Sequence, residues 1–292
     1  MFSPNDSLGA LSDSEIADYL LAIGDKEGAK EFLDGDIAGQ GLFGVQRPWR
    51  HTGMMLGFVD QNDSDAGEVP IVGVSQVRAD KDLIGKRIKI TMDKFFVESY
   101  PGRGTHDILC DFSGKNQIAG EAEELRLALR FKCNDKASAA RSGTPIFLGV
   151  TVGEDGIAFE GRTVNLSSSS DEQLLSTFES PAFKSGLTLL TTAQPALKPF
   201  VGLAGSVVKF LASQGSNRQV HDFNLGLDFA SGASSARLRL GSYIVIQTDE
   251  TTWDWSNYVW DRNAMSLKSK KPHEDGTGFN YMVFGVAQFS DA

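Results

Sequence analysis

The residues best suited to recognition chemistry are four aromatic side chains that lie close together near the end of the sequence. Trp253, Trp255, Tyr258 and Trp260 include three of the chain's four tryptophans, and Asp254 and Asp261 lie beside them. Exposed rings of this kind supply a large, rigid contact area for a protein partner or a sugar ring. Buried rings would instead close the end of a β-sheet core. The four aromatic residues are therefore candidate partner-binding residues, and both interpretations stay open at this point.

The segment from Gly39 to Gly44 matches the Gly-x-Gly-x-x-Gly pattern of a dinucleotide site in letters only. Such a site needs a strand before it and a helix after it, so that the pyrophosphate meets the helix N-terminus. Here Asp34-Gly35-Asp36 precedes the glycines, and Pro48 would interrupt a following helix. The chain also lacks the phosphate-binding loop and the Gly-x-Ser-x-Gly elbow. We predict no cofactor.

The histidines and cysteines do not form a recognisable metal site. The chain has four histidines, His51, His106, His221 and His273, and two cysteines, Cys110 and Cys133. None of them has the short spacing that zinc ligands show. Both cysteines lie in apolar, strand-like segments, which predicts buried free thiols. His106-Asp107 and His221-Asp222 open predicted strands, where such residues commonly bond a turn backbone.

The stretch from Asp60 to Glu68 is rich in side-chain oxygens and could attract calcium. Its spacing differs from an EF-hand loop, because Ile71 occupies the twelfth position where the loop requires Glu. A polar hairpin loop explains the same composition without a metal. The acidic group of Asp249, Glu250, Asp254 and Asp261 is equally loose and does not have the spacing of a metal site. We predict no tight metal site.

The composition indicates a folded protein with an acidic surface. The chain has 292 residues and is 41% hydrophobic, which is enough for a sizeable core. Its 38 acidic residues outnumber its 28 basic residues, giving a formal charge of -10 that disfavours nucleic acid. The first residues do not read as a secretory signal, and no run is long and apolar enough to span a membrane. We therefore expect a cytoplasmic protein and predict neither a nucleic acid nor a membrane as its partner.

The sequence begins with helical signals. Ser12 and Glu15 have the spacing of a capping box, in which each side chain bonds a free amide of the other residue. Apolar residues then recur at helical spacing as far as Ile23, and Gly24 is a plausible stop. A second short helix is expected around Phe32.

After Val69 the pattern changes to short apolar runs and period-two alternation, separated by turn residues. The expected strands are 71–77, 87–92, 106–112, 125–131, 146–152, 157–166, 220–229, 236–240, 243–248 and 279–289. An amphipathic helix is expected over 200–211, because Phe200, Leu203, Val207 and Leu211 share one face. The segment from Thr251 to Gly278 reads as an unusually long loop.

An internal similarity suggests duplication. His106-Asp107, followed by an apolar stretch, Asp-Phe and Ser-Gly, recurs 115 residues later from His221-Asp222. We therefore predict a mainly β protein of two tandem antiparallel β-sandwiches, which resembles C2-like domains in outline. The predicted divisions are a helical cap and loops at 1–68, a sandwich at 69–168, a helical linker at 169–216, and a sandwich at 217–292. The second sandwich has room for strand material from 183–195.

The prediction for function is a non-enzymatic binding or scaffolding protein that recognises a protein or surface ligand through loops of a β-sandwich. One alternative is a carbohydrate-binding or hydrolytic module whose site is assembled from loops. Another is a membrane-acting protein that uses the helix at 200–211. That helix carries few basic residues, which favours packing over insertion into a membrane surface.

Overall fold

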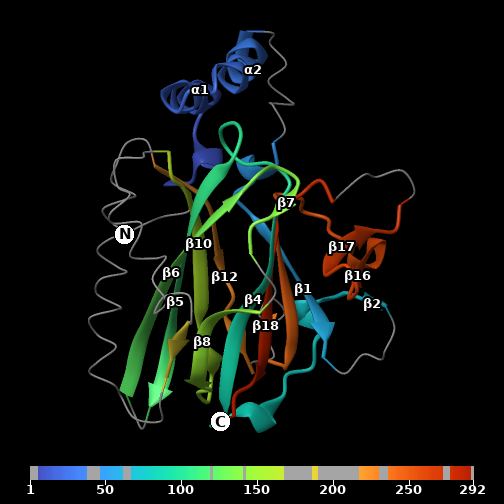
Figure 1. Ribbon diagram of the computed structural model, residues 1–292. Coiled ribbons are helices and arrows are strands. Elements are labelled where there is room, and N and C mark those ends of the chain that lie inside the picture. Colours follow the sequence, from blue (N-terminus) through green and yellow to red (C-terminus); the bar gives the residue numbers. More distant parts are fainter. Residues whose placement is uncertain are drawn as a thin grey trace.

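The computed structural model describes residues 6–37, 47–61, 67–118, 121–140, 143–167, 186–189, 217–229, 236–271 and 277–290. These residues form a mainly β structure, as predicted, with several sheets and two α-helices (Figure 1). The apolar alternation that predicted strands therefore identified the fold class correctly. The helix predicted over 200–211, most of the linker at 169–216 and the glycine-rich segment from Gly39 to Gly44 lie outside the described residues.

The two helices form a pair at one end of the sheets, at the top of Figure 1. Helix α1 spans Asp13–Ala22 and α2 spans Lys26–Ile37. The predicted capping box is confirmed, since the Glu15 amide donates to Ser12 Oγ and the Ser12 amide donates to Glu15 Oε2. Gly24 follows α1 with a φ of +86°, a conformation that glycine adopts readily. Short 3-10 turns are η2 (Leu8–Ala10), η3 (Pro48–Arg50), η4 (Val74–Gln76), η5 (Lys81–Leu83) and η8 (Trp255–Asn257).

An eight-stranded sheet, called here the main sheet, runs through the centre of the molecule. Its order is β11 (Leu187–Thr188), β8 (Thr144–Thr151), β4 (Arg87–Val97), β18 (Tyr281–Gln288), β15 (Gly241–Gln247), β1 (Met54–Asp60) and β3 (Val72–Gly73), with β7 (Ala137–Ser138) paired to β4. The pairs are antiparallel except for β11 and β8, which run parallel. β11 falls in the segment 183–195 where strand material was expected.

A four-stranded sheet packs on one face of the main sheet. Its order is β12 (Arg218–Asn224), β10 (Phe159–Asn165), β5 (His106–Ile118) and β6 (Glu121–Cys133). The ring of Phe284 on β18 lies 6.0, 5.1 and 5.3 Å from those of Phe112, Phe159 and Phe223, which come from three strands of this sheet. Cys110 and Cys133 are buried here, as predicted. The core between the two sheets is thus built on phenylalanine.

A small sheet, called here the aromatic sheet, lies on the opposite face of the main sheet. Its order is β17 (Ser266–Ser269), β16 (Tyr258–Asp261) and β2 (Glu68–Pro70). Tyr243 and Val245 of β15 belong to the phenylalanine core, whereas Ile244 and Ile246 pack with the aromatic sheet. The central strands are therefore buried on both faces. A further small sheet joins β14 (Ala236–Arg237), β13 (Leu227–Asp228) and β9 (Gly156–Ile157).

The predicted separation into two tandem sandwiches is wrong for the described strands. β5 and β12, which carry the two His-Asp pairs, belong to one sheet and flank the same strand, β10. Thr163 pairs with Cys110 on one side and His221 on the other, so His221 is aligned with Cys110 and not with His106. The main sheet likewise mixes β4 and β8 with β15 and β18. The two segments therefore do not occupy equivalent positions, and the described strands do not confirm the C2-like outline.

Three local predictions also need correction. Residues 54–60, placed among cap and loops, form β1 inside the main sheet. The strand expected over 71–77 is only the short β3 followed by the 3-10 turn η4. The expected long loop from Thr251 to Gly278 contains η8 and the β16–β17 hairpin.

Gly57 of β1 tests the packing of the aromatic sheet on the main sheet. A Cβ at this position would lie 2.7 Å from the Trp255 ring and from Ile71 Cγ2. We expect Gly57→Ala to lower the free energy of unfolding by about 1–3 kcal/mol, because an extra methyl group overpacks the contact. Urea unfolding would measure the change.

Gly226→Ala is the matched control. Gly226 is exposed, and the nearest atom to an added Cβ is Asn224 Oδ1 at 3.4 Å. Its unfolding free energy should change much less. Equal effects of the two substitutions would mean that Gly57 is not needed for the contact with Trp255.

Candidate functional site

The structure divides the four predicted binding residues into two pairs. Trp255 in η8 and Trp260 on β16 are only 9% and 4% exposed. Both pack with apolar side chains of the main sheet, among them Val59, Ile244 and Val283. These two tryptophans are therefore part of the core between the aromatic sheet and the main sheet.

Trp253 and Tyr258 form the second pair, and both are half-buried. Their rings stack with centroids 5.0 Å apart and planes at 3°. Phe279 meets Trp253 edge-on at 5.2 Å. These three rings line a pocket of about 430 Å³, called here the aromatic pocket. Its rim also carries polar side chains, including Glu250, Asp254, Asn257 and Lys271.

A capped turn places the two tryptophans on different sides. Asp254 precedes η8, and its Oδ1 accepts from the Ser256 amide at 2.9 Å while its Oδ2 accepts from the Ser256 hydroxyl at 2.8 Å. These hydrogen bonds from Ser256 hold the pKa of Asp254 below its usual range. Lys270 Nζ donates to the Ser256 carbonyl at 2.9 Å. The turn therefore sends Trp255 into the core and leaves Trp253 at the pocket.

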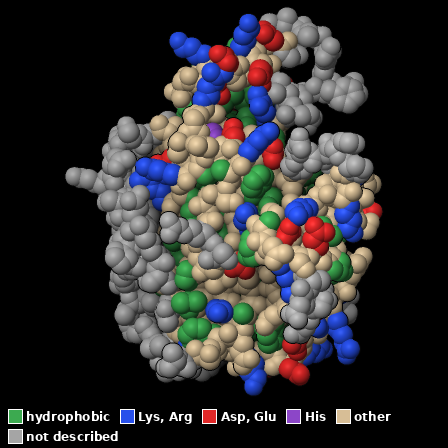
Figure 2. All heavy atoms as spheres, turned by 45° about the vertical axis from the view of Figure 1, so that its right-hand side comes forward, with side chains coloured by type: hydrophobic (Ala, Val, Ile, Leu, Met, Phe, Trp, Pro, Cys, Tyr) green, Lys and Arg blue, Asp and Glu red, His purple; other side chains and the backbone are tan. Residues whose placement is uncertain are grey.

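The β16–β17 hairpin is fixed by one carboxylate and one ammonium group. Asp261 Oδ1 accepts from the amides of Asn263 and Ala264 in the turn, and its other oxygen pairs with Lys268. The Lys268 ammonium is the main reason that the pKa of Asp261 is lowered. Lys268 also pairs with Glu68 of β2 at 3.3 Å. Acidic and basic side chains thus alternate on this face, which comes forward in Figure 2.

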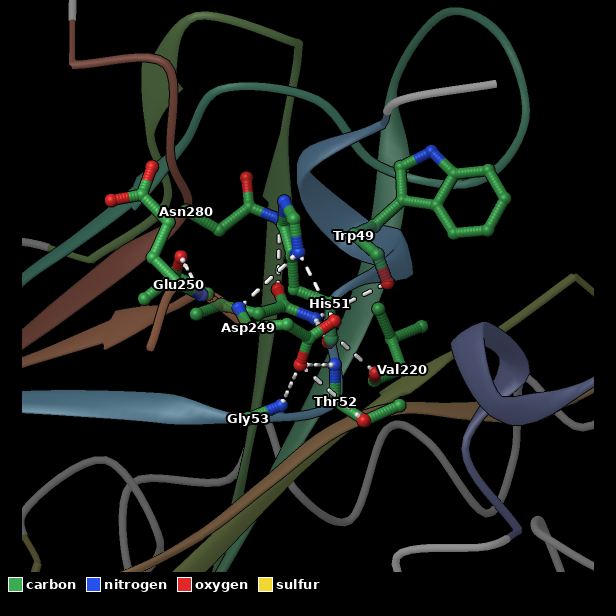
Figure 3. A network of polar contacts seen from close by, with 10 residues as sticks. Trp49, His51, Thr52, Gly53, Val220, Asp249, Glu250 and Asn280 are labelled. Carbon is green, nitrogen blue, oxygen red and sulfur yellow. Dashed lines mark hydrogen bonds and ion pairs between the residues drawn. The ribbon is translucent and has the colours of Figure 1, made fainter. Parts of the chain in front are cut away.

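The stretch 248–279, which carries the aromatic residues, is called here the aromatic segment. A polar network holds its start in place (Figure 3). Asp249 Oδ1 accepts from the amides of Thr52 and Gly53 at 3.0 and 2.6 Å, and its Oδ2 lies 3.2 Å from His51 Nδ1. The next residue, Glu250, lies on the pocket rim. The backbone that leads into the pocket is therefore tied to the segment before β1.

Two buried amides join both ends of the aromatic segment. Asn280 Nδ2 donates to Gln247 Oε1 at 3.0 Å, so the residues just before and just after the segment are linked through their side chains. Gln247 Nε2 donates to the carbonyls of Trp49 and His51 at 3.2 and 2.7 Å. The Gln247–Asn280 hydrogen bond therefore holds the two ends of the aromatic segment side by side.

His106 and His221 make structural contacts, and His273 lies outside the described residues. His106 Nε2 lies 2.8 Å from Asp135 Oδ1 at the start of β5. His221 is fully buried, which lowers its pKa to about 4, while a hydrogen bond to the Gly53 backbone opposes that shift. In the described part of the chain, neither His51 nor His106 has a hydrogen bond to a serine or cysteine that would suggest a nucleophile.

Among the described residues, no group of three or more His, Cys, Asp or Glu side chains is placed so that it could hold a metal ion. Most of the acidic stretch from Asp60 to Glu68 lies outside the described residues. Its described ends are engaged elsewhere, since Asp60 pairs with Arg239 at 2.8 Å and Glu68 pairs with Lys268.

No family model, curated protein or solved structure matches this chain. In the portion of the chain that is described, none of the helices has the length and apolar character needed to cross a membrane. The site must therefore be interpreted from its own geometry.

Sequence reasoning missed several parts of the aromatic pocket. Phe279 was assigned to a strand, although it lies just before β18 and its ring contacts Trp253. Glu250 and Asn257 carried no motif. The pairing of Asp249 with His51 links residues that are 198 positions apart, so no local sequence pattern signals it.

The two pairs of aromatic residues should differ in their effect on stability. Trp255→Ala and Trp260→Ala should each lower the free energy of unfolding by about 3–5 kcal/mol, because they leave cavities in a packed core. Tyr258→Ala should have a clearly smaller effect, since its ring is half exposed to solvent. Chemical denaturation of the three variants would measure the difference. An equal loss for Tyr258→Ala would place that ring in the core as well.

Acid should weaken the polar network beneath the pocket through His221. The folded protein keeps this imidazole neutral down to about pH 4, whereas an unfolded histidine binds a proton near pH 6.5. Unfolding therefore takes up a proton between these values, and stability is complete above about pH 6.5 and falls as the pH decreases. From pH 7 to 4.5 the expected loss is about 2–3 kcal/mol.

The measurement is unfolding at both pH values for the wild type and for His221→Gln, which lacks the titrating group. The difference between the two proteins isolates His221 from the nearby Asp249 and His51, which also influence it. An NMR titration in which the His221 ring titrates near pH 6.5 in the folded protein would contradict this prediction.

Proposed function

We propose that this chain is a non-enzymatic binding protein that recognises a segment of a partner protein in the aromatic pocket. The observation that carries the proposal is the pocket itself, whose volume of about 430 Å³ is typical of ligand sites. The pocket combines the rings of Trp253, Tyr258 and Phe279 with six polar or charged residues, which are Glu250, Thr252, Asp254, Asn257, Lys271 and Thr277. This composition resembles the centres of protein interfaces, where aromatic anchors dominate the binding energy.

The rigidity of the pocket supports the proposal. Trp253 is held between the stacked ring of Tyr258 and the edge of Phe279, and Trp255 contacts it edge-on at 5.4 Å. The buried pair Trp255 and Trp260 anchors the same segment to the main sheet. Side chains already fixed in one conformation lose little entropy on binding, which favours affinity.

The charge distribution favours a protein partner over a nucleic acid. Lys268 lies between Glu68 and Asp261, and acidic and basic side chains alternate over this face (Figure 2). A phosphate backbone is bound by a surface of one sign, whereas protein interfaces use mixed rims. The overall charge of -10 works in the same direction.

A carbohydrate ligand is the second candidate. Aromatic faces stack on sugar rings, and the Asn257 amide and Glu250 carboxylate at the rim would bond hydroxyl groups. The hydrolytic version is weaker, because Asp254 is occupied by Ser256. The membrane-acting alternative depends on residues 200–211, which lie outside the described residues, and gains no support.

The test is selection of binding peptides from a random displayed library, with a glycan array as the parallel probe. Peptides selected on the wild type should bind Trp253→Ala and Tyr258→Ala at least about tenfold more weakly, a loss of ~1.4 kcal/mol. Ile84→Ala is the control, since it removes a side chain that is 39% exposed and outside the pocket lining. Circular dichroism of each variant would show that it is folded.

The outcomes separate the two candidates. Peptide binding that depends on Tyr258 and Trp253 but not on Ile84 supports the protein partner. Glycans bound with the same dependence support the carbohydrate site instead. Peptides and glycans that bind all three variants as well as the wild type would exclude the aromatic pocket as a recognition site.

A further inference from the structure

A second, much smaller cavity lies between the main sheet and the four-stranded sheet. Its volume is about 10 Å³, and its lining includes Tyr100, Thr163, His221, Gln247 and Asn280. Thr163 belongs to β10 and His221 to β12, whereas Tyr100 lies between β4 and β5. The cavity is thus surrounded by segments that are far apart in the sequence.

Three buried polar atoms at this cavity have no hydrogen-bond partner in the protein. They are Tyr100 Oη, Thr163 Oγ1 and His221 Nε2. The three residues are 3%, 2% and 5% exposed, so bulk water does not reach them. A buried polar atom without a partner typically costs about 1–3 kcal/mol. Three such atoms around one cavity indicate a shared partner.

The chemistry of the three atoms is complementary to a water molecule. The other ring nitrogen of His221 bonds the Gly53 backbone, and because this contact favours the protonated ring, the backbone group is the carbonyl acceptor. The proton of the neutral ring is therefore on Nδ1, and Nε2 is an acceptor. The Tyr100 hydroxyl is a donor that burial keeps protonated, since it raises the pKa of Tyr100 well above its usual value. The Thr163 hydroxyl can accept or donate.

We infer that the cavity binds one ordered water molecule, which accepts a hydrogen bond from Tyr100 Oη and donates to His221 Nε2 and Thr163 Oγ1. Its volume is close to the minimum of roughly 10–15 Å³ that a single water needs, so a larger ligand is excluded. Three hydrogen bonds are the usual number for a buried water. One water at this position would give all three atoms, Tyr100 Oη, Thr163 Oγ1 and His221 Nε2, a hydrogen-bond partner.

An ion is a poorer occupant than water. The residues that line the cavity are uncharged while His221 is neutral, so an ion would be buried without a counter-charge. A direct hydrogen bond between the Tyr100 and Thr163 hydroxyls would leave His221 Nε2 unsatisfied. The Thr163 hydroxyl faces that of Tyr100 and acts on its pKa as a hydrogen-bonding group that opposes the effect of burial, yet the distance and angles between the two hydroxyls do not meet those of a hydrogen bond.

The bound water gives the buried histidine a role in the fold. It joins β10 and β12 to the segment that carries Tyr100, beside the Gln247–Asn280 pair of the main sheet. The protein would then use a solvent molecule as part of the contact between its two large sheets. This inference is independent of the aromatic pocket and its ligand.

The test combines crystallography with water relaxation measurements in solution. A high-resolution crystal structure of the full chain should show one water within hydrogen-bonding distance of the three atoms. Magnetic relaxation dispersion of ¹⁷O should detect a long-lived internal water that is lost in Tyr100→Phe and Thr163→Val. Tyr243→Phe is the control, since its hydroxyl donates to the Arg237 carbonyl and lies outside this cavity.

Loss of the relaxation contribution in Tyr100→Phe or Thr163→Val, with retention in Tyr243→Phe, supports the inference. If either variant fails to fold, the wild-type crystal structure decides. Electron density that shows an empty cavity, or a Tyr100 hydroxyl bonded directly to Thr163 or His221, would overturn it. A relaxation contribution that is unchanged in both folded variants would overturn it as well.

Discussion

The hydrogen bond between the buried side chains of Gln247 and Asn280 organises the part of the molecule where most segments meet. Gln247 also donates to the carbonyls of Trp49, His51 and Val220, and Asn280 Oδ1 accepts from the amides of Glu98 and Ser99 at 2.8 and 3.2 Å. Each amide thus satisfies backbone groups of other segments: Gln247 those of η3, the loop after it and β12, and Asn280 those of the residues just after β4. In a low-dielectric interior such a network is strong when complete and costly when any member is lost. The main sheet, β12, the segment before β1 and the aromatic segment all depend on it.

Burial of the central strands on both faces explains the double role of the aromatic segment. Tyr243, Ile244, Val245 and Ile246 form an unbroken apolar run in β15, as expected of a strand covered on both sides. One face needs the phenylalanine core, and the other needs Trp255 and Trp260. Because the segment must cover the main sheet, its position is set by packing. Trp253 and Tyr258 lie at the edge of this segment and are half-buried. The buried Trp255 and Trp260 hold the segment that carries them against the main sheet.

The sequence predicted local features well where a residue acts through its nearest neighbours. Ser12 and Glu15 cap α1 by contacts within one turn, and the strands around Ile90, Phe112 and Val283 follow from alternation alone. Prediction from the sequence failed where residues far apart in the chain determine the local structure. β1 was missed, and the need for a small residue at Gly57 is visible only from its close approach to Trp255 and Ile71. The apparent repeat misled because His106 and His221 have similar neighbours in sequence but different registers in the sheet.

The candidate site shows the same limit. Composition identified the right segment, but exposure depends on which rings the main sheet buries, and no sequence spacing separates Trp253 from Trp255 in that respect. The capped turn at Asp254 lies between the two residues, because Trp253 precedes the cap in extended chain and Trp255 begins η8. The described histidines and several of the described carboxylates form contacts that hold segments together, as with Asp249 and the amides of Thr52 and Gly53. The aromatic pocket thus lies beside side chains whose hydrogen bonds hold the chain in place, such as Asp249 next to Glu250 and Asp254 at the capped turn.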